Sequence, residues 1–393
     1  MRYTNGRVRV AMLCGALTIG AFGCESETPC DESRGVACVW AGTFRAGFNG
    51  DERPLAESQL YWPVDVSFTS NGDPYVLDWN NHRVRRVTEQ GTFETVIGTD
   101  FVGDGDPLEG DLVPPGVPGT HISLNHPTQL LEEPDGSLLL VAWHNHKLRR
   151  FDPATGLVYV VCGRGAGFEG DGAALDETTR LNQPSGGVMA SDGSLFLLDQ
   201  RNQRVRRVDP SGVIETVVGT GESGFDGDGG PPLEAMLNLP KGSNPPPAGT
   251  LTLDAQGRLY IADTLNHRIR RVDFANDLIE TVAGDGQARF GGDGGPATQA
   301  SINNPRDLAI GPDGRLYVAD EGNHRVRAVD LETGVITTVM GTGQPGQGAD
   351  GLPPRETDLS KPAGVAFDHE GRLYVSDTDN NVIRRIALEE VEP

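Results

Sequence analysis

Histidines at one repeated position are the first residues in this 393-residue chain that could carry chemistry. Each follows an asparagine in a recurring phrase, Asn-His-Arg-Val-Arg-Arg or a close variant of it. The six copies of the position hold His82, His146, Gln203, His267, His324 and Asn381. Imidazole can bind a metal or transfer a proton near neutral pH. An amide does neither but makes hydrogen bonds, so we expect a structural, hydrogen-bonding role at all six copies.

An arginine three residues after that position offers a second kind of chemistry, the pairing of a guanidinium with a carboxylate. The repeated arginines are Arg85, Arg149, Arg206, Arg270, Arg327 and Arg384. In five copies an aspartate ends the apolar run before the phrase, at Asp78, Asp199, Asp263, Asp320 and Asp377. The second copy has Ala142 there instead. We expect charge-assisted hydrogen bonds between these residues to stabilise each repeat.

Aspartates in glycine-rich segments, such as Asp226-Gly227-Asp228-Gly229, suggest calcium, which prefers a compact loop of oxygen ligands. The EF-hand spacing is absent, so we interpret them as turn residues that cap backbone N–H groups. The sequence also lacks a Gly-x-Ser-x-Gly elbow, a His-Glu-x-x-His motif and a clustered Cys/His zinc pattern. His121, His126 and His144 are the histidines that could approach a metal together. We assign no catalytic residue, no metal ligand and no cofactor, and keep calcium or zinc as alternatives.

The elements that position these residues are short strands in a repeated order. Turn glycines recur every 57 or 64 residues, and most units have Asn-Gly or Asp-Gly at the first turn, a strong hairpin signal. Four antiparallel strands repeated six times predict an all-β, six-bladed β-propeller. The sixth unit has no fourth strand, whereas residues 38–43 match one. We expect this N-terminal strand to complete the C-terminal blade and close the ring.

Tryptophans mark one face of the predicted propeller, the face shared by the linkers between blades and the turns after each second strand. Trp62 ends the first linker, Trp79 lies in that turn of the first blade, and Trp143-His144 lie there in the second. Exposed aromatic residues are typical binding anchors, although packing beneath the linkers is the alternative. Residues early in the first strands face the central channel. The polar candidates there for a small ligand are Asp65, Gln129, Arg306 and Asp307.

The repeated phrase and the strand before it resemble the NHL repeat. The linkers Gly224 to Pro240 and Phe290 to Pro305 resemble those of bacterial and teneurin-type NHL propellers, and the resemblance covers about residues 36–388. It implies the propeller fold but no single activity. NHL propellers include protein-binding scaffolds, RNA-binding modules, receptor-kinase sensors and peptide-amidating lyases, and a fold does not choose among such functions.

The N-terminal residues are typical of an export signal. Three arginines precede an apolar run from Val10 to Phe22 that is too short to span a bilayer. The sequence Ala21-Phe22-Gly23-Cys24 resembles a bacterial lipobox, in which Cys24 becomes lipidated. We expect a signal peptide over 1–23, a short tether over 24–35 and the propeller over 36–390. The predicted location is the bacterial cell envelope, lipid-anchored in the outer membrane or periplasm, with secretion as the alternative.

Exported cysteines that lie close together in sequence favour a disulfide, and Cys30 and Cys38 are the candidates. Cys162 lies in an apolar run and is expected to be buried.

The net charge of −23 disfavours nucleic acid as a partner and leaves a lipid anchor as the expected contact with a membrane. We therefore predict a monomeric, non-catalytic scaffold that binds a protein, peptide or glycan through the linker face. The alternative is a propeller enzyme that uses the central channel, either an amidating-lyase-like metalloenzyme or a sugar or lactone hydrolase.

Overall fold

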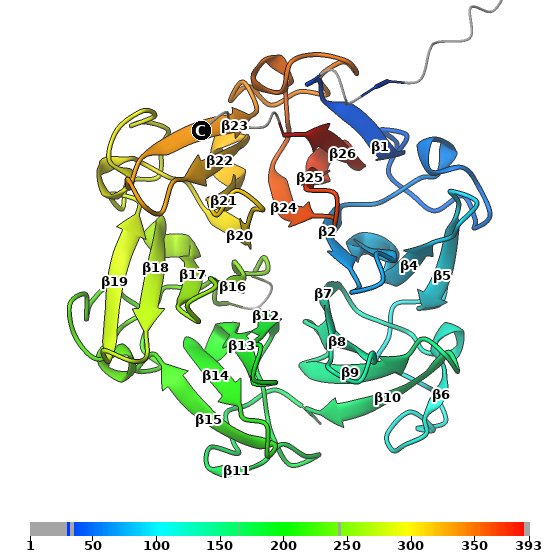
Figure 1. Cartoon of the computed structure of the whole chain (residues 1–393). Helices are drawn as coiled ribbons and strands as arrows, with labels where there is room; N and C mark the ends of the chain where they lie inside the picture. The colour runs from blue at the N-terminus through cyan, green and yellow to red at the C-terminus, as the bar shows by residue number, and fades with distance from the viewer. Residues whose placement is uncertain (1–29, 32–34, 164, 243–244, 389–393) are drawn as a thin grey trace, which may run out of the picture.

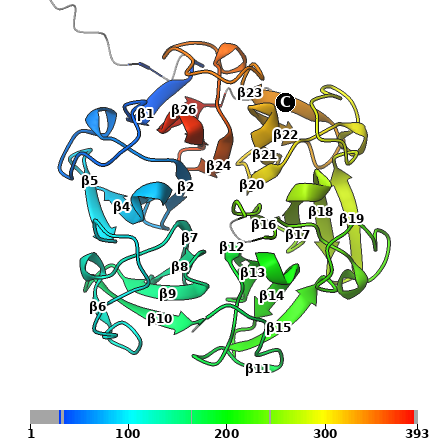
Figure 2. The ribbon, with the colours of Figure 1, turned by 180° about the vertical axis from the view of Figure 1, so that it is seen from behind.

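Six antiparallel sheets surround a central axis in the computed structural model, which describes residues 30–31, 35–163, 165–242 and 245–388 (Figure 1). The helical segments described are single 3-10 turns of three residues. The view from behind shows the same closed ring (Figure 2). The predicted all-β, six-bladed β-propeller is confirmed.

Each blade has four main strands that run in chain order from the axis to the rim, except that β1 is the outermost strand of the last blade. Blade 1 holds β2 (Pro63–Phe68), β3 (Pro74–Asp78), β4 (Arg83–Val87) and β5 (Phe93–Ile97). Blade 2 holds β7 (Pro127–Glu132), β8 (Leu138–Ala142), β9 (Lys147–Asp152) and β10 (Leu157–Cys162). Blade 3 holds β12 (Pro184–Met189), β13 (Leu195–Asp199), β14 (Arg204–Val208) and β15 (Val213–Val218).

The remaining blades follow the same order. Blade 4 holds β16 (Leu251–Leu253), β17 (Leu259–Asp263), β18 (Arg268–Asp273) and β19 (Leu278–Ala283). Blade 5 holds β20 (Pro305–Ile310), β21 (Leu316–Asp320), β22 (Arg325–Val329) and β23 (Ile336–Met340). Blade 6 holds β24 (Pro362–Phe367), β25 (Arg372–Asp377), β26 (Val382–Ala387) and β1 (Cys38–Gly42).

The ring is closed by β1, which pairs antiparallel with β26 at the outer edge of blade 6 (Figure 1). The register places Cys38 opposite Arg385 and Gly42 opposite Val382. An unpaired β26 would expose a row of backbone hydrogen-bonding groups, which invites aggregation. The predicted closure by the N-terminal strand is therefore confirmed, and it joins the two ends of the propeller.

Linkers cover the outer strands of the blades. In the linker before blade 1, Glu52 N–H donates a hydrogen bond to the carbonyl of Phe93 in β5. In the linker before blade 5, Gly294 N–H donates one to the carbonyl of Ile336 in β23. In blades 2 and 3 the linker adds a two-residue strand, β6 (Val117–Pro118) on β10 and β11 (Ala173–Ala174) on β15. Each linker thus crosses the face of the ring and also protects part of an edge.

The repeated arginines are fully buried and hold these linkers in place. Arg270 contacts Asp263 of its own blade at 3.3 Å and the linker residue Asp228 at 2.7 Å. The predicted pairing with the aspartate at the end of the second strand is confirmed. The prediction that linker aspartates cap backbone N–H groups is only partly right. Asp51, for example, accepts from Thr95 N–H with one oxygen and from Arg85 with the other.

In blade 2 the buried arginine needs a different carboxylate partner, because Ala142 cannot pair with Arg149. The carboxylate that replaces the missing aspartate is Asp111, which is 1% exposed and pairs with Arg149 Nη1. Asp111 comes from an insertion in the linker before this blade. The exposed residue Asp104 adds a second contact to Arg149 at 3.3 Å.

Replacing Asp111 by alanine should lower the free energy of unfolding by about 3–5 kcal/mol, since it leaves a buried guanidinium without its main partner. Chemical denaturation would measure this loss. Asp100→Ala is the matched control, because Asp100 is 78% exposed in its pair with Arg83 and exposed pairs contribute about 0–1 kcal/mol. Adding Ala142→Asp should restore part of the stability. Equal losses for Asp111→Ala and Asp100→Ala would contradict this account.

Candidate functional site

Short 3-10 turns after the second strands build one face of the ring. They include η3 (Trp79–Asn81), η5 (Gln200–Asn202) and η7 (Thr264–Asn266), and each ends in a residue with a left-handed backbone. That residue is the repeated histidine or its amide replacement. His82 Nδ1 accepts a hydrogen bond at 3.2 Å from the backbone N–H of His126, the last linker residue before blade 2. Asn381 Oδ1 accepts one at 3.0 Å from Trp62 N–H.

The same bond between neighbouring blades recurs at the other junctions. The remaining acceptor and donor pairs are His146 with Gln183, Gln203 with Leu239, His267 with Asn304, and His324 with Lys361. Burial lowers the pKa of His82, His146, His267 and His324, so their rings stay neutral and can accept. The predicted structural role of this position is confirmed.

The candidate tryptophans lie together over blades 1 and 2. The ring centroid of Trp79 is 5.9 Å from that of Trp62 and 6.1 Å from that of Trp143. Trp62 is 38% exposed, and Trp79 is half-buried. Both come from segments of the same face: Trp62 ends a linker and Trp79 begins η3. They form the accessible part of an aromatic cluster.

Trp143 differs from the expected exposed anchor, because it is only 1% exposed. Its ring stacks under His144 with a centroid distance of 3.8 Å, and its Nε1 donates to Gln200 Oε1 at 2.9 Å. Gln200 in turn accepts from Ala248 N–H, so the indole is locked between blades. Trp143 therefore supports the face and presents His144 on it.

His126 completes the cluster, although the sequence singled it out only as a possible metal ligand. Its ring stacks on Trp79 at 3.9 Å, and its Nδ1 lies 2.7 Å from His144 Nδ1. His121, the third histidine considered with this pair, is exposed in η4 (Gly119–His121). One signal could have found the role of His126: it occupies the same position before the first strand of its blade as Trp62.

The four channel candidates occupy the innermost strands. Asp65, Arg306 and Asp307 line a cavity of about 20 Å³ on the axis, which has room for about one water molecule. Asp307 accepts from Thr250 Oγ1 at 2.5 Å and from Val365 N–H at 2.8 Å, and it thereby joins blades 4, 5 and 6. Gln129 Oε1 accepts from Gly187 N–H of blade 3 at 2.6 Å. The channel polar groups therefore connect blades and leave little space for a ligand.

The two carboxyl groups near the axis have raised pKa values. Burial first, and then the charge of Asp307, raise the pKa of Asp65 to about 7. Burial raises the pKa of Asp307 to about 6, although hydrogen bonds from Thr250 and Val365 oppose the shift. Two buried carboxylates next to each other are costly to ionise together. The channel therefore takes up a proton as the pH falls through neutrality.

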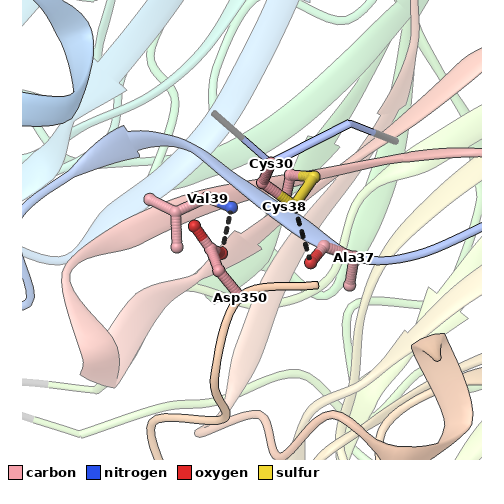
Figure 3. Close-up of a disulfide and its surroundings, with 5 residues drawn as sticks. All are labelled: Cys30, Ala37, Cys38, Val39 and Asp350. Atoms are coloured by element: carbon pink, nitrogen blue, oxygen red, sulfur yellow. Dashed lines mark hydrogen bonds between the residues drawn. A yellow bond between two sulfur atoms is a disulfide. The ribbon is translucent and has the colours of Figure 1, made fainter. Parts of the chain in front are cut away.

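The described cysteines are a disulfide pair and one buried thiol. Cys30 and Cys38 form a disulfide with Cα atoms 5.6 Å apart, beside the point where Val39 N–H donates to Asp350 (Figure 3). This ties the chain before the propeller to the rim of blade 6. Cys162 is buried, and burial raises the pKa of its thiol to about 12, so it is a poor nucleophile. Cys24 lies outside the described residues.

Within residues 30–31, 35–163, 165–242 and 245–388, no three or more His, Cys, Asp or Glu side chains are grouped so that they could hold a metal ion. Over the same residues, no helix has the length and apolar character needed to cross a membrane.

Comparison with known proteins identifies the repeat. Residues 303–328, which include β20, β21 and the start of β22, match the NHL repeat. The chain is a six-bladed β-propeller that contains an NHL repeat, and it is called the NHL propeller below. The NHL propeller is 29% identical over 311 residues to NHL repeat-containing protein 2 of Bos taurus, covering 72% of this chain and 41% of that protein. It is 27% identical over 284 residues to Protein SUPPRESSOR OF QUENCHING 1, chloroplastic, of Arabidopsis thaliana, covering 70% of this chain and 24% of that protein.

The NHL propeller thus spans less than half the length of either relative. Among solved structures it is similar to an auxiliary nutrient binding protein from Bacteroides thetaiotaomicron, with a TM-score of 0.61 and 17% identity. The similarity covers 90% of this chain and 76% of that one. At this identity the likeness concerns the fold.

Replacing Asp65 by asparagine should make the NHL propeller more stable relative to the wild type as the pH rises from about 4 to about 7. A raised pKa means that the folded wild type holds a proton that the unfolded chain releases, so this contribution to stability is lost through that window. Denaturant midpoints for both proteins across pH 4–8 would test this, with the exposed Asp277→Asn as control. A difference that does not vary with pH would show that Asp65 ionises normally.

Proposed function

We propose that the NHL propeller is a non-catalytic binding scaffold that captures a protein, peptide or glycan on the linker face over blades 1 and 2. The observation that carries this proposal is the aromatic cluster of Trp62, Trp79, His126, Trp143 and His144 on that face. The other blades have Gln200, Thr264, Glu321 and Thr378 where blade 1 has Trp79 and blade 2 has Trp143. A feature that departs from the repeat is not needed to build a blade, which favours a role in recognition.

The channel geometry weighs against the alternative of a propeller enzyme. A sugar or lactone substrate needs a pocket of several hundred Å³, whereas the axial cavity of about 20 Å³ holds about one water molecule. Three of its polar groups, on Thr250, Arg306 and Asp307, already make hydrogen bonds between blades. Binding on the face above the channel needs neither a deep pocket nor an activated nucleophile. The nutrient binding protein of similar fold is an example of a propeller with a binding role.

A place in the bacterial cell envelope, with the protein held there by a lipid on Cys24, is the second part of the proposal. The Cys30–Cys38 disulfide supports it, because disulfides persist in oxidising compartments outside the cytoplasm. The net charge of −23 repels nucleic acid and anionic lipid surfaces, so the lipid would be the contact with the membrane. Secretion of the same monomeric propeller is the alternative location.

Trp62→Ala should weaken partner capture about tenfold or more, since exposed aromatic anchors carry much of the binding free energy. The change should leave the thermal midpoint nearly unaltered, because the indole is 38% exposed. Quantitative pull-down from envelope extract, followed by titration of the captured partner, would measure it. Leu265→Ala is the control: it removes a 39% exposed apolar side chain from η7, the 3-10 turn of blade 4. Equal capture by both variants would place binding elsewhere.

Cys24→Ala should release the full-length protein from the membrane fraction into the soluble fraction, because the lipid can no longer be attached. Cell fractionation and immunoblotting would follow the change. The buried Cys162, changed to alanine, serves as the control and should leave fractionation unaltered. Retention of the Cys24→Ala protein in the membrane fraction would exclude this anchor.

A further inference from the structure

The hydrogen bonds of the aromatic cluster determine where its protons lie. His126 Nε2 is 3.1 Å from Asn80 Oδ1, and an amide oxygen can only accept, so Nε2 carries the hydrogen. In a neutral ring, His126 Nδ1 is then bare and must accept from His144 Nδ1 at 2.7 Å. His144 Nε2 is consequently a bare acceptor, and it makes no hydrogen bond to any described residue. The hydrogen-bonded series Asn80–His126–His144 therefore ends in an unused lone pair on His144 Nε2.

Burial keeps this pair of imidazoles uncharged. Burial first, and then the neighbouring histidines, lower the pKa of His126 to about 3 and that of His144 to about 4. Both rings are therefore neutral at physiological pH. The face over blades 1 and 2 presents hydrogen-bonding atoms without a net charge from its histidines.

Further polar atoms of the same region lack partners among the described residues. Gln183 is 3% exposed and its Oε1 makes no hydrogen bond, and Trp79 Nε1 also lacks an acceptor. Gln183 is the repeat equivalent of His126: its N–H donates to His146 as that of His126 donates to His82. Gln183 therefore lies beside the turn of blade 2, just as His126 lies beside the turn of blade 1 that contains Asn80. The Trp79 and Gln183 atoms are buried beneath the face, so neither is open to a ligand, and His144 Nε2 is the unused acceptor that matters for recognition.

The aromatic part of the cluster is a stacked surface. Trp79 stacks on His126 with an interplanar angle of 27°, and Trp143 stacks on His144 with an angle of 21°. Trp62 packs beside Trp79 and leaves 38% of its surface exposed. The exposed part of the Trp62 indole therefore offers an apolar surface at the edge of these stacked rings.

We propose that this face binds a neutral saccharide, with one sugar ring lying on Trp62 and a hydroxyl donating to His144 Nε2. The inference rests on the proposed binding function and names its ligand class. A sugar hydroxyl can donate to the unused acceptor on His144, and the C–H face of a pyranose suits the exposed indole of Trp62. A peptide is the less favoured ligand. Protein hot spots usually fill pockets, and the blade edges that could add a peptide strand are partly covered by linkers.

Affinity electrophoresis of the mature protein in gels that contain starch, β-glucan, xylan or mannan tests the proposal, followed by calorimetry with the matching oligosaccharide. At least one polymer should retard the wild type. Trp62→Ala should weaken the affinity about tenfold or more. His144→Phe, which keeps a ring over Trp143 but removes the acceptor, should weaken it about two- to tenfold. Leu265→Ala should behave as the wild type, and thermal midpoints would verify folding of each variant.

Two results would overturn the saccharide assignment: retardation by none of the polymers, or retardation that neither Trp62→Ala nor His144→Phe reduces. Capture of a protein or peptide in a Trp62-dependent manner, without saccharide binding, would also overturn it but would leave the binding-scaffold function standing. If the wild type neither binds a saccharide nor captures a partner in a Trp62-dependent manner, the proposed binding function would be wrong as well.

Discussion

A buried guanidinium in every blade is the constraint on which the rest of the propeller depends. The six repeated arginines are fully removed from water, and an unpaired buried charge is too costly to keep. Five of them receive oxygens from two directions, their own sheet and the linker that crosses above it, whereas Arg149 takes both of its carboxylates from the linker. Arg327 shows the pattern with Asp320 from β21, Asp293 from the linker and the linker carbonyl of Gly291. Once a linker is held at that point, its continuation lies on the outer strand.

The arginine contacts that stabilise a blade also determine where the side chains of the linker face lie. The linker that satisfies an arginine ends at the left-handed residue just before the next inner strand. At five junctions the backbone N–H of that residue donates to the residue that ends the 3-10 turn of the preceding blade, as Trp62 does to Asn381 and His126 to His82. At the sixth junction Leu239 makes the same bond to Gln203. The side chains of these linker ends consequently meet the side chains of the turns. Trp62 and His126 contact Trp79 for this reason, and the aromatic cluster therefore forms where the linker ends meet the turns.

Blade 2 departs from the repeat in several places at once. Ala142 replaces the paired aspartate, Asp111 from an insertion replaces its carboxylate, and Asp104 stands where most other linkers place a phenylalanine over the arginine. The same blade carries Trp143 and His144. Because the insertion restores the pairing of Arg149, the blade keeps its stability while the turn is free to hold residues that a plain repeat does not need.

Local patterns in the sequence determined the number of blades, the closure by residues 38–43, the structural role of the repeated histidine and the face on which the tryptophans lie. These features follow from the repeat length and from the motif that recurs in every unit, both of which can be read from the sequence. Only the tertiary structure decided that Trp143 is buried, that His126 and Asn80 order the protons of His144, and that Asp111 serves Arg149. Asp111 and Arg149 are far apart in the chain, and the others meet across a junction between blades. Their contacts depend on how linkers pass over neighbouring sheets, a geometry that exists only after the ring has closed.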